Sequence, residues 1–147
     1  MEYFKTDVTD TIKSFYEENP FPNYEDLDSI WSLREKAEKA IFARLLDDQI
    51  SHSAKVLEVG CGTGQLSNFL GLSGGRTVFA TDICLNSLKL GQDFKEKNQI
   101  DNVVFLQMNL FRPVFKPSSF DVVICNGVLH HTSNPFLGFQ LLSKLVK

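Results

Sequence analysis

Several features that would suggest other classes of protein are missing from this 147-residue sequence. No apolar run approaches the length of a membrane span, and the N-terminus, MEYFKTDVTD, lacks the apolar core of a secretory signal. Three scattered cysteines form no C-x-x-C pair, which indicates reduced thiols without a metal site. There is no basic excess, since 15 basic and 18 acidic residues give a net charge of −3. We therefore expect a cytoplasmic protein with neither a membrane nor a nucleic-acid partner.

What is present is the composition of one ordinary domain, with 43% apolar and 22% charged residues. Residues 1–28 form an acidic, proline-containing segment, in which 12–18 are compatible with a short helical turn. Residues 29–50 repeat apolar side chains at helical spacing, which predicts one N-terminal helix. The sequence Ser32-Leu33-Arg34-Glu35 fits a capping box.

From residue 51 to 147 the pattern changes to alternating strands and helices. We expect strands at 55–59, 77–81, 103–107 and 120–125, and helices at 65–72, 87–97 (capped by Asn86) and from Pro135 (capped by Asn134). Apolar strands separated by helices indicate parallel pairing and right-handed crossovers. The fold class is therefore α/β, a doubly wound, Rossmann-like and mostly parallel sheet. In this topology the first strand is central, the second and third lie on one side, and the fourth on the other.

A glycine-rich turn, Gly60-Cys61-Gly62-Thr63-Gly64, follows the first strand. Glycines at this point let a ligand approach the backbone closely, although a purely structural turn has the same appearance. The dinucleotide fingerprint G-x-G-x-x-G requires a third glycine where this chain has Gln65. Glu58, just before the turn, would repel phosphates. The turn therefore favours a cationic ligand over a pyrophosphate.

The residues Glu58, Gly60, Gly62 and Gly64 resemble the first motif, E-x-G-x-G-x-G, of the class I S-adenosylmethionine-dependent methyltransferases. This resemblance implies that the turn, with Cys61, cradles the methionine part of S-adenosylmethionine, and that S-adenosylhomocysteine is the product. Asp82 ends the second strand, where a carboxylate can accept hydrogen bonds from ribose hydroxyls. A solvated strand-end aspartate is the alternative.

Further positions match the family in order and spacing. The resemblance implies cofactor contacts after each remaining strand, by Ile83 against the adenine ring, Asn109 and Leu110, and Asn126 and Gly127. Asn109 replaces the family's usual aspartate, but its amide oxygen can still accept a hydrogen bond. His130 would lie near the transferred methyl group, where a histidine can act as a catalytic base. The alternative is that His130 packs beside the loop or caps polar groups.

The segment 19–24, Asn-Pro-Phe-Pro-Asn-Tyr, resembles a stretch that precedes the core in some of these enzymes. It suggests a lid over the cofactor, formed with Tyr16, Phe21 and Tyr24. A surface turn before the next helix is the alternative.

The resemblance implies methyl transfer by in-line displacement to a small-molecule acceptor, without a metal. The family's sheet has seven strands, whereas only four are found before Lys147. The second hypothesis is therefore a non-catalytic cofactor-binding fragment or a partner-dependent half-domain, and the third is a nucleotide-binding Rossmann protein. A fourth strand, Val122-Val123-Ile124, at the edge of the sheet would favour self-association. We expect residues 1–147 alone to bind the cofactor weakly and to lack a closed acceptor site.

Overall fold

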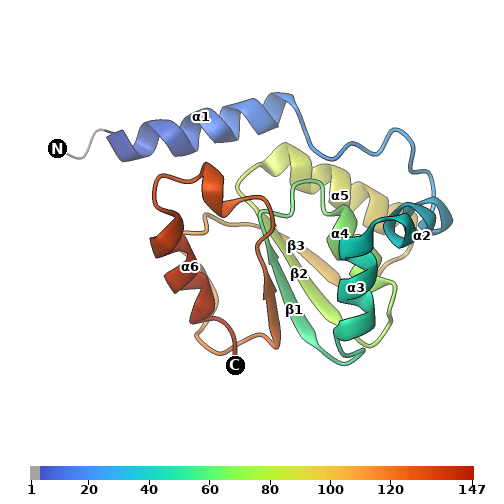
Figure 1. The fold of residues 1–147 in the computed structure, drawn as a ribbon. Coiled ribbons are helices and arrows are strands. Elements are labelled where there is room, and N and C mark those ends of the chain that lie inside the picture. Colours follow the sequence, from blue (N-terminus) through green and yellow to red (C-terminus); the bar gives the residue numbers. More distant parts are fainter. Residues whose placement is uncertain (1–3) are drawn as a thin grey trace.

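A computed structural model describes residues 4–147 and has a parallel four-stranded sheet at its centre (Figure 1). The strands are β1 (Lys55–Val59), β2 (Thr77–Asp82), β3 (Val103–Gln107) and β4 (Val122–Ile124). Their order is β3-β2-β1-β4, and all neighbours are parallel. The predicted fold class and strand order are confirmed. The carboxyl ends of the strands meet at one edge, where Asp82 pairs with Gln107 and Val59 with Thr81.

Helices cover both faces of the sheet because side chains alternate between the faces along each strand. On one face, Val56, Val78 and Val103 pack with α4 (Gln65–Gly71) and α5 (Leu85–Lys97). The helices α2 (Ile30–Lys39) and α3 (Ile41–Gln49) extend this core. On the other face, Leu57 and Phe120 pack with α6 (Pro135–Ser143). Figure 1 shows α1 (Phe4–Glu18) crossing above the sheet, apart from both layers.

The strand β4 lies at the end of the sheet order, as expected, but its side chains are more covered than those of an exposed apolar edge. Ile124 is buried, Val122 and Val123 are half-buried, and Phe120, just before the strand, forms a parallel bridge with Val146. Both faces of β4 contribute to the core, so its side chains are covered even though the strand lies at the end of the sheet order.

The N-terminal helices also differ from expectation. The predicted helix over 29–50 is interrupted at Ala40, which is extended (φ −89°, ψ 111°) between α2 and α3. The capping box lies at Ser29 and Ser32 instead of Ser32 and Glu35, because Ser29 is the last extended residue (φ −151°, ψ 169°). The short turn predicted over 12–18 is part of a longer helix, α1.

The start of α5 shows how a tertiary contact changes a cap. Cys84 is the N-cap residue, and the helix begins at Leu85. The Glu17 carboxylate accepts hydrogen bonds from the backbone N–H groups of Leu85 (3.1 Å) and Asn86 (3.3 Å). The Asn86 side chain, predicted to be the cap, instead donates to the Glu17 carbonyl. The end of α1 is thereby joined to the start of α5.

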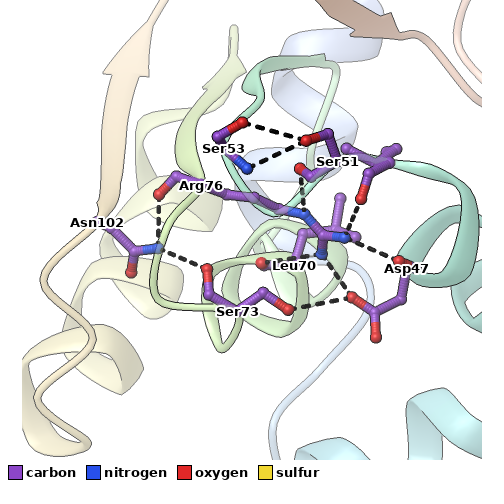
Figure 2. Close-up of polar contacts among 8 residues, drawn as sticks. Asp47, Ser51, Ser53, Leu70, Ser73, Arg76 and Asn102 are labelled. Atoms are coloured by element: carbon purple, nitrogen blue, oxygen red, sulfur yellow. Dashed lines mark hydrogen bonds and ion pairs between the residues drawn. The ribbon is translucent and has the colours of Figure 1, made fainter.

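Arg76 joins two helices to the amino end of β2 (Figure 2). Its guanidinium group is fully buried and pairs with the Asp47 carboxylate. It also donates to main-chain carbonyls at the C-terminal ends of two helices: those of Asp47, Ile50 and Ser51 at the end of α3, and that of Leu70 in the last turn of α4. The Leu70 and Ser51 carbonyls also accept backbone N–H groups, so the cation adds to these bonds, supplies a donor to the Asp47 and Ile50 carbonyls, and complements both helix dipoles.

Within residues 4–147, no helix combines the length and the apolar character that crossing a lipid bilayer requires.

Candidate functional site

A cavity of about 680 Å³ lies at the carboxyl edge of the sheet, in the size range of small-molecule sites. The structure brings to it every residue predicted to bind the cofactor or to act in catalysis, with one exception: Glu58, Gly60, Cys61, Gly62, Asp82, Ile83, Asn109, Leu110, Asn126, Gly127 and His130. The exception is Gly64, which is the N-cap of α4. A Cβ atom on Gly64 would lie 2.3 Å from the Phe105 ring, so this glycine serves helix–sheet packing rather than the cavity wall.

The glycine turn requires glycine for both conformation and space. Gly60, Gly62 and Gly64 all have positive φ (72°, 56° and 70°). A Cβ on Gly60 would lie 2.3 Å from the Val128 side chain, and one on Gly62 would lie 2.2 Å from the Phe21 carbonyl oxygen. The two glycines thus admit neighbouring protein segments as well as a ligand.

All five backbone N–H groups of the turn already donate within the protein. Those of residues 60 and 61 donate to the Thr81 carbonyl, and that of residue 64 donates to the Cys61 carbonyl. Residue 63 donates to Phe21, and residue 62 donates to the Asp82 carboxylate. A pyrophosphate site uses free N–H groups at this position. This turn offers none, which supports the argument from Gln65 against a dinucleotide.

Asp82 holds the turn against the end of β2. One carboxylate oxygen accepts from Gly62 N–H and the other from Cys84 N–H, both at 2.8 Å. Each oxygen keeps a second lone pair for a ligand hydroxyl. Burial raises the pKa of Asp82 above its usual value, opposed by these hydrogen bonds.

Glu58 is a second carboxylate on the cavity wall and is buried, only 7% exposed, whereas Asp82 is half-buried. Burial raises its pKa to about 7, and the nearby Asp82 charge adds to the shift, while the hydrogen bond from the Ser67 hydroxyl opposes it. Neither Glu58 nor Asp82 forms a salt bridge among the described residues. Two desolvated carboxylates without a cationic partner favour a ligand that carries positive charge and hydroxyl groups.

The other predicted positions differ in whether their polar groups already form hydrogen bonds and in how exposed they are. The Asn109 oxygen accepts from Phe111 N–H (2.9 Å), so the predicted bond to adenine would use its second lone pair. Gly127 has positive φ (71°) and, like Asn126, is exposed on the cavity wall. His130 is exposed in the 3₁₀ turn Leu129–His131, and its ring lies 3.9 Å from that of His131.

The segment 19–24 is docked on the glycine turn. The Thr63 hydroxyl donates to the Pro22 carbonyl, and the Gln65 side chain donates to the Asn23 carbonyl. Tyr16 and Phe21 line the cavity, as the lid hypothesis requires. Tyr24 does not: its ring packs on Phe94 (4.8 Å between centroids), and its hydroxyl donates to the Thr63 carbonyl.

Sequence reasoning missed two parts of the site. Ser67 lies nine residues after Glu58, a spacing that follows no strand or helix period, and only the β1–α4 packing brings the two together. In the sequence, Gln65 is informative only because it stands where a dinucleotide site would have a glycine. In the structure, its side chain donates a hydrogen bond to the Asn23 carbonyl of the docked segment. No local signal identifies either role.

The strand order, the glycine turn after β1 and the acid at the end of β2 are together typical of the Rossmann-like fold of the S-adenosylmethionine-dependent methyltransferases. Residues 57–147 match the family described as "Methyltransferase domain", and the chain belongs to this family. The expected family, that of the S-adenosylmethionine-dependent methyltransferases, is thereby confirmed.

Three similar proteins illustrate the match. The chain is 31% identical over 94 residues to a ubiquinone biosynthesis O-methyltransferase of Paracidovorax citrulli, covering 63% of this chain and 39% of that protein. It is 28% identical over 139 residues to a protein-lysine N-methyltransferase of Saccharomyces cerevisiae, covering 87% and 58%. A crystal structure of a SAM-dependent methyltransferase from Aquifex aeolicus has the same fold, with a TM-score of 0.66, 19% identity, and coverage of 92% of this chain and 67% of that one. The chain spans less than two thirds of either curated relative.

Proposed function

We propose that this chain binds S-adenosylmethionine in the cavity at the carboxyl edge and transfers its methyl group to a small-molecule acceptor. The observation that carries the proposal is that a buried carboxylate, Glu58, and a half-buried one, Asp82, lie on the cavity wall with no salt bridge among the described residues, beside a glycine turn whose N–H groups all donate within the protein. Helix α1 contributes Ile12 and Tyr16 to the wall, so the cavity is covered above the sheet edge. A covered cavity suits a small acceptor better than a side chain presented by a folded protein.

The cofactor supplies a methyl group that its sulfonium makes electrophilic. We assign the ribose hydroxyls to the free lone pairs of Asp82, and the adenine ring to Ile83, Leu110 and Asn109. Glu58 and the backbone of Gly60 and Gly62 provide an anionic wall that admits the methionine part closely. Rigid placement of these groups supplies alignment, which is a main requirement of a displacement reaction.

His130 is the proposed proton acceptor. It lines the same cavity as the cofactor-binding residues and lies beyond the backbone of Asn126 and Gly127. A neutral imidazole can take the proton that an acceptor hydroxyl loses on methylation. We expect its replacement to affect turnover more than cofactor affinity.

Calorimetric titration tests the proposed function directly. We expect S-adenosylmethionine and S-adenosylhomocysteine to bind, and NAD to bind far more weakly. Asp82→Ala should lower S-adenosylhomocysteine affinity at least tenfold, because a hydrogen bond to a charged group contributes about 1.5–3 kcal/mol. Its melting temperature should also fall, since Gly62 and Cys84 lose their acceptors.

Asp101→Asn, which changes an exposed carboxylate before β3, is the matched control and should leave both quantities unchanged. Tighter binding of NAD than of S-adenosylmethionine would overturn the assignment. Unchanged affinity in Asp82→Ala would remove Asp82 from the site.

The raised pKa of Glu58 predicts a pH-dependent affinity. With a pKa of about 7 the side chain is largely protonated at pH 6 and ionised at pH 8. S-adenosylmethionine, a cation at sulfur, should therefore bind up to about tenfold more tightly at pH 8 than at pH 6, with release of a proton. Calorimetry in buffers of different ionisation enthalpy measures that proton.

The same shift affects the stability of the free protein in the opposite direction. A carboxyl with a raised pKa in the folded state stabilises the fold below its unfolded pKa, and this contribution is lost as the pH rises through about 7. Glu58→Gln should flatten both profiles. If the variant keeps the wild-type pH dependence of affinity, another group is responsible.

A further inference from the structure

The cavity continues beyond the residues assigned to the cofactor. A second set of wall residues comes from α2, α3 and the docked segment, which we call the helical lobe: Phe21, Lys36, Ala37, Ala40, Phe42 and Ala43. Figure 1 shows α2 and α3 beside α4, to one side of the strands that carry the cofactor-binding positions. None of the residues in the helical lobe belongs to the sheet or to the glycine turn.

Small side chains and the helix break leave the helical lobe open. Three of its residues are alanines, and Ala40 is the extended residue between α2 and α3. Its two aromatic residues are strongly exposed, Phe21 by 70% and Phe42 by 47%. Aromatic side chains that line a cavity and are not covered by the protein are suited to pack against an apolar ligand.

Lys36 gives the helical lobe a positive charge, whereas the sheet edge of the cavity carries carboxylates. Among the described residues it is the one lysine or arginine on the cavity wall, and it forms no salt bridge there. Its neighbour on the helix, Lys39, differs in both respects, because it pairs with Glu35 and lies outside the wall. The two carboxylates of the cavity, Glu58 and Asp82, lie on the sheet edge instead.

We propose that the helical lobe binds the methyl acceptor, and that this acceptor has an apolar, ring-sized body and an anionic group held by Lys36. The proposal rests on the proposed function and specifies its substrate class. Lys36 could instead pair with the carboxylate of S-adenosylmethionine. The experiment below separates this alternative from binding of an anionic acceptor.

The probe is 8-anilinonaphthalene-1-sulfonate, which combines an aromatic body with one anionic group and fluoresces in apolar surroundings. It is titrated into protein saturated with S-adenosylhomocysteine. We expect one site, weakened at least fivefold by Lys36→Gln and unchanged within twofold by the control Lys39→Gln. Ala40→Phe, a change at an exposed position, should fill the lobe and weaken the probe at least fivefold.

S-adenosylhomocysteine affinity is measured for every variant and should stay within twofold of wild type. A loss of that affinity in Lys36→Gln would assign Lys36 to the cofactor's carboxylate and overturn the proposal. Probe binding that neither Lys36→Gln nor Ala40→Phe alters would also overturn it. Failure of S-adenosylhomocysteine to bind the wild-type protein would instead refute the proposed function. In that case, titration of the probe into the ligand-free protein and its variants would still test whether the helical lobe binds an anionic aromatic molecule.

Discussion

Replacing Arg76 by leucine is expected to lower the free energy of unfolding by about 3 kcal/mol, because its buried guanidinium group both pairs with the partly exposed Asp47 carboxylate and donates to main-chain carbonyls. The loss has two parts. Asp47 loses its counter-ion, and the main-chain carbonyls of Asp47 and Ile50 lose a donor. Both helix ends that Arg76 caps should loosen (Figure 2).

Urea unfolding measures the change, and Arg76→Lys is the informative companion. Lysine keeps the charge but has no planar fork to reach the carbonyls of two helices, so most of the loss should remain. Because Arg76 lies at the amino end of β2, opposite the cavity, the folded fraction should bind S-adenosylhomocysteine with wild-type affinity. A loss below about 1 kcal/mol would show that the pair is replaceable by packing.

Gly62→Ala is expected to reduce S-adenosylhomocysteine affinity at least tenfold and to release the segment 19–24. The new Cβ would lie 2.2 Å from the Phe21 carbonyl oxygen, which is main chain and has no rotamer to change. The turn also has φ +56°, a conformation that disfavours alanine. Either the turn or the docked segment must move, and the Asp82 bond to Gly62 N–H moves with the turn.

Calorimetry measures the affinity, and limited chymotrypsin digestion measures release through cleavage after Tyr24. Gly74→Ala is the control, since a Cβ at Gly74 meets nothing within 4 Å and its φ is not positive. If both variants behave alike, the close approach of Phe21 to the turn is not important for the site.

The position of the site could be predicted from the sequence, because its main residues stand at the ends of strands that the sequence reveals. Gly60, Asp82, Asn109 and Asn126 each follow a strand that is visible in the apolar pattern, and parallel strands bring their carboxyl ends to one edge. Their meeting at one cavity could therefore be predicted. Their bonding could not, because the hydrogen bonds from Gly62 to Asp82 and from Ser67 to Glu58 depend on which side chains the packing brings together.

In the N-terminal region, the sequence predicts less of the structure than it does at the sheet edge. The apolar spacing over 29–50 indicates helix correctly but contains nothing that marks the break at Ala40, which lies between two helices that contact each other. The cap at Cys84 likewise depends on Glu17, which is distant in sequence. Such elements are short and amphipathic, so tertiary contacts outweigh their intrinsic preferences.

The sequence by itself determined the α/β class, the strand order, the family and the identity of the residues at the sheet edge. The class and the strand order follow from the apolar periodicity, and the family and the edge residues follow from the glycine turn at 60–64 and from Asp82 at the end of the next strand. Only the tertiary structure decided that the segment 19–24 lies on that turn, that Gly64 serves packing, and that α2 and α3 open a lobe containing Lys36. The first two of these features arise from contacts between residues 41 positions apart in the sequence, Thr63 with Pro22 and Gly64 with Phe105. Their free energy depends on shape and desolvation in the assembled core, which no local pattern encodes.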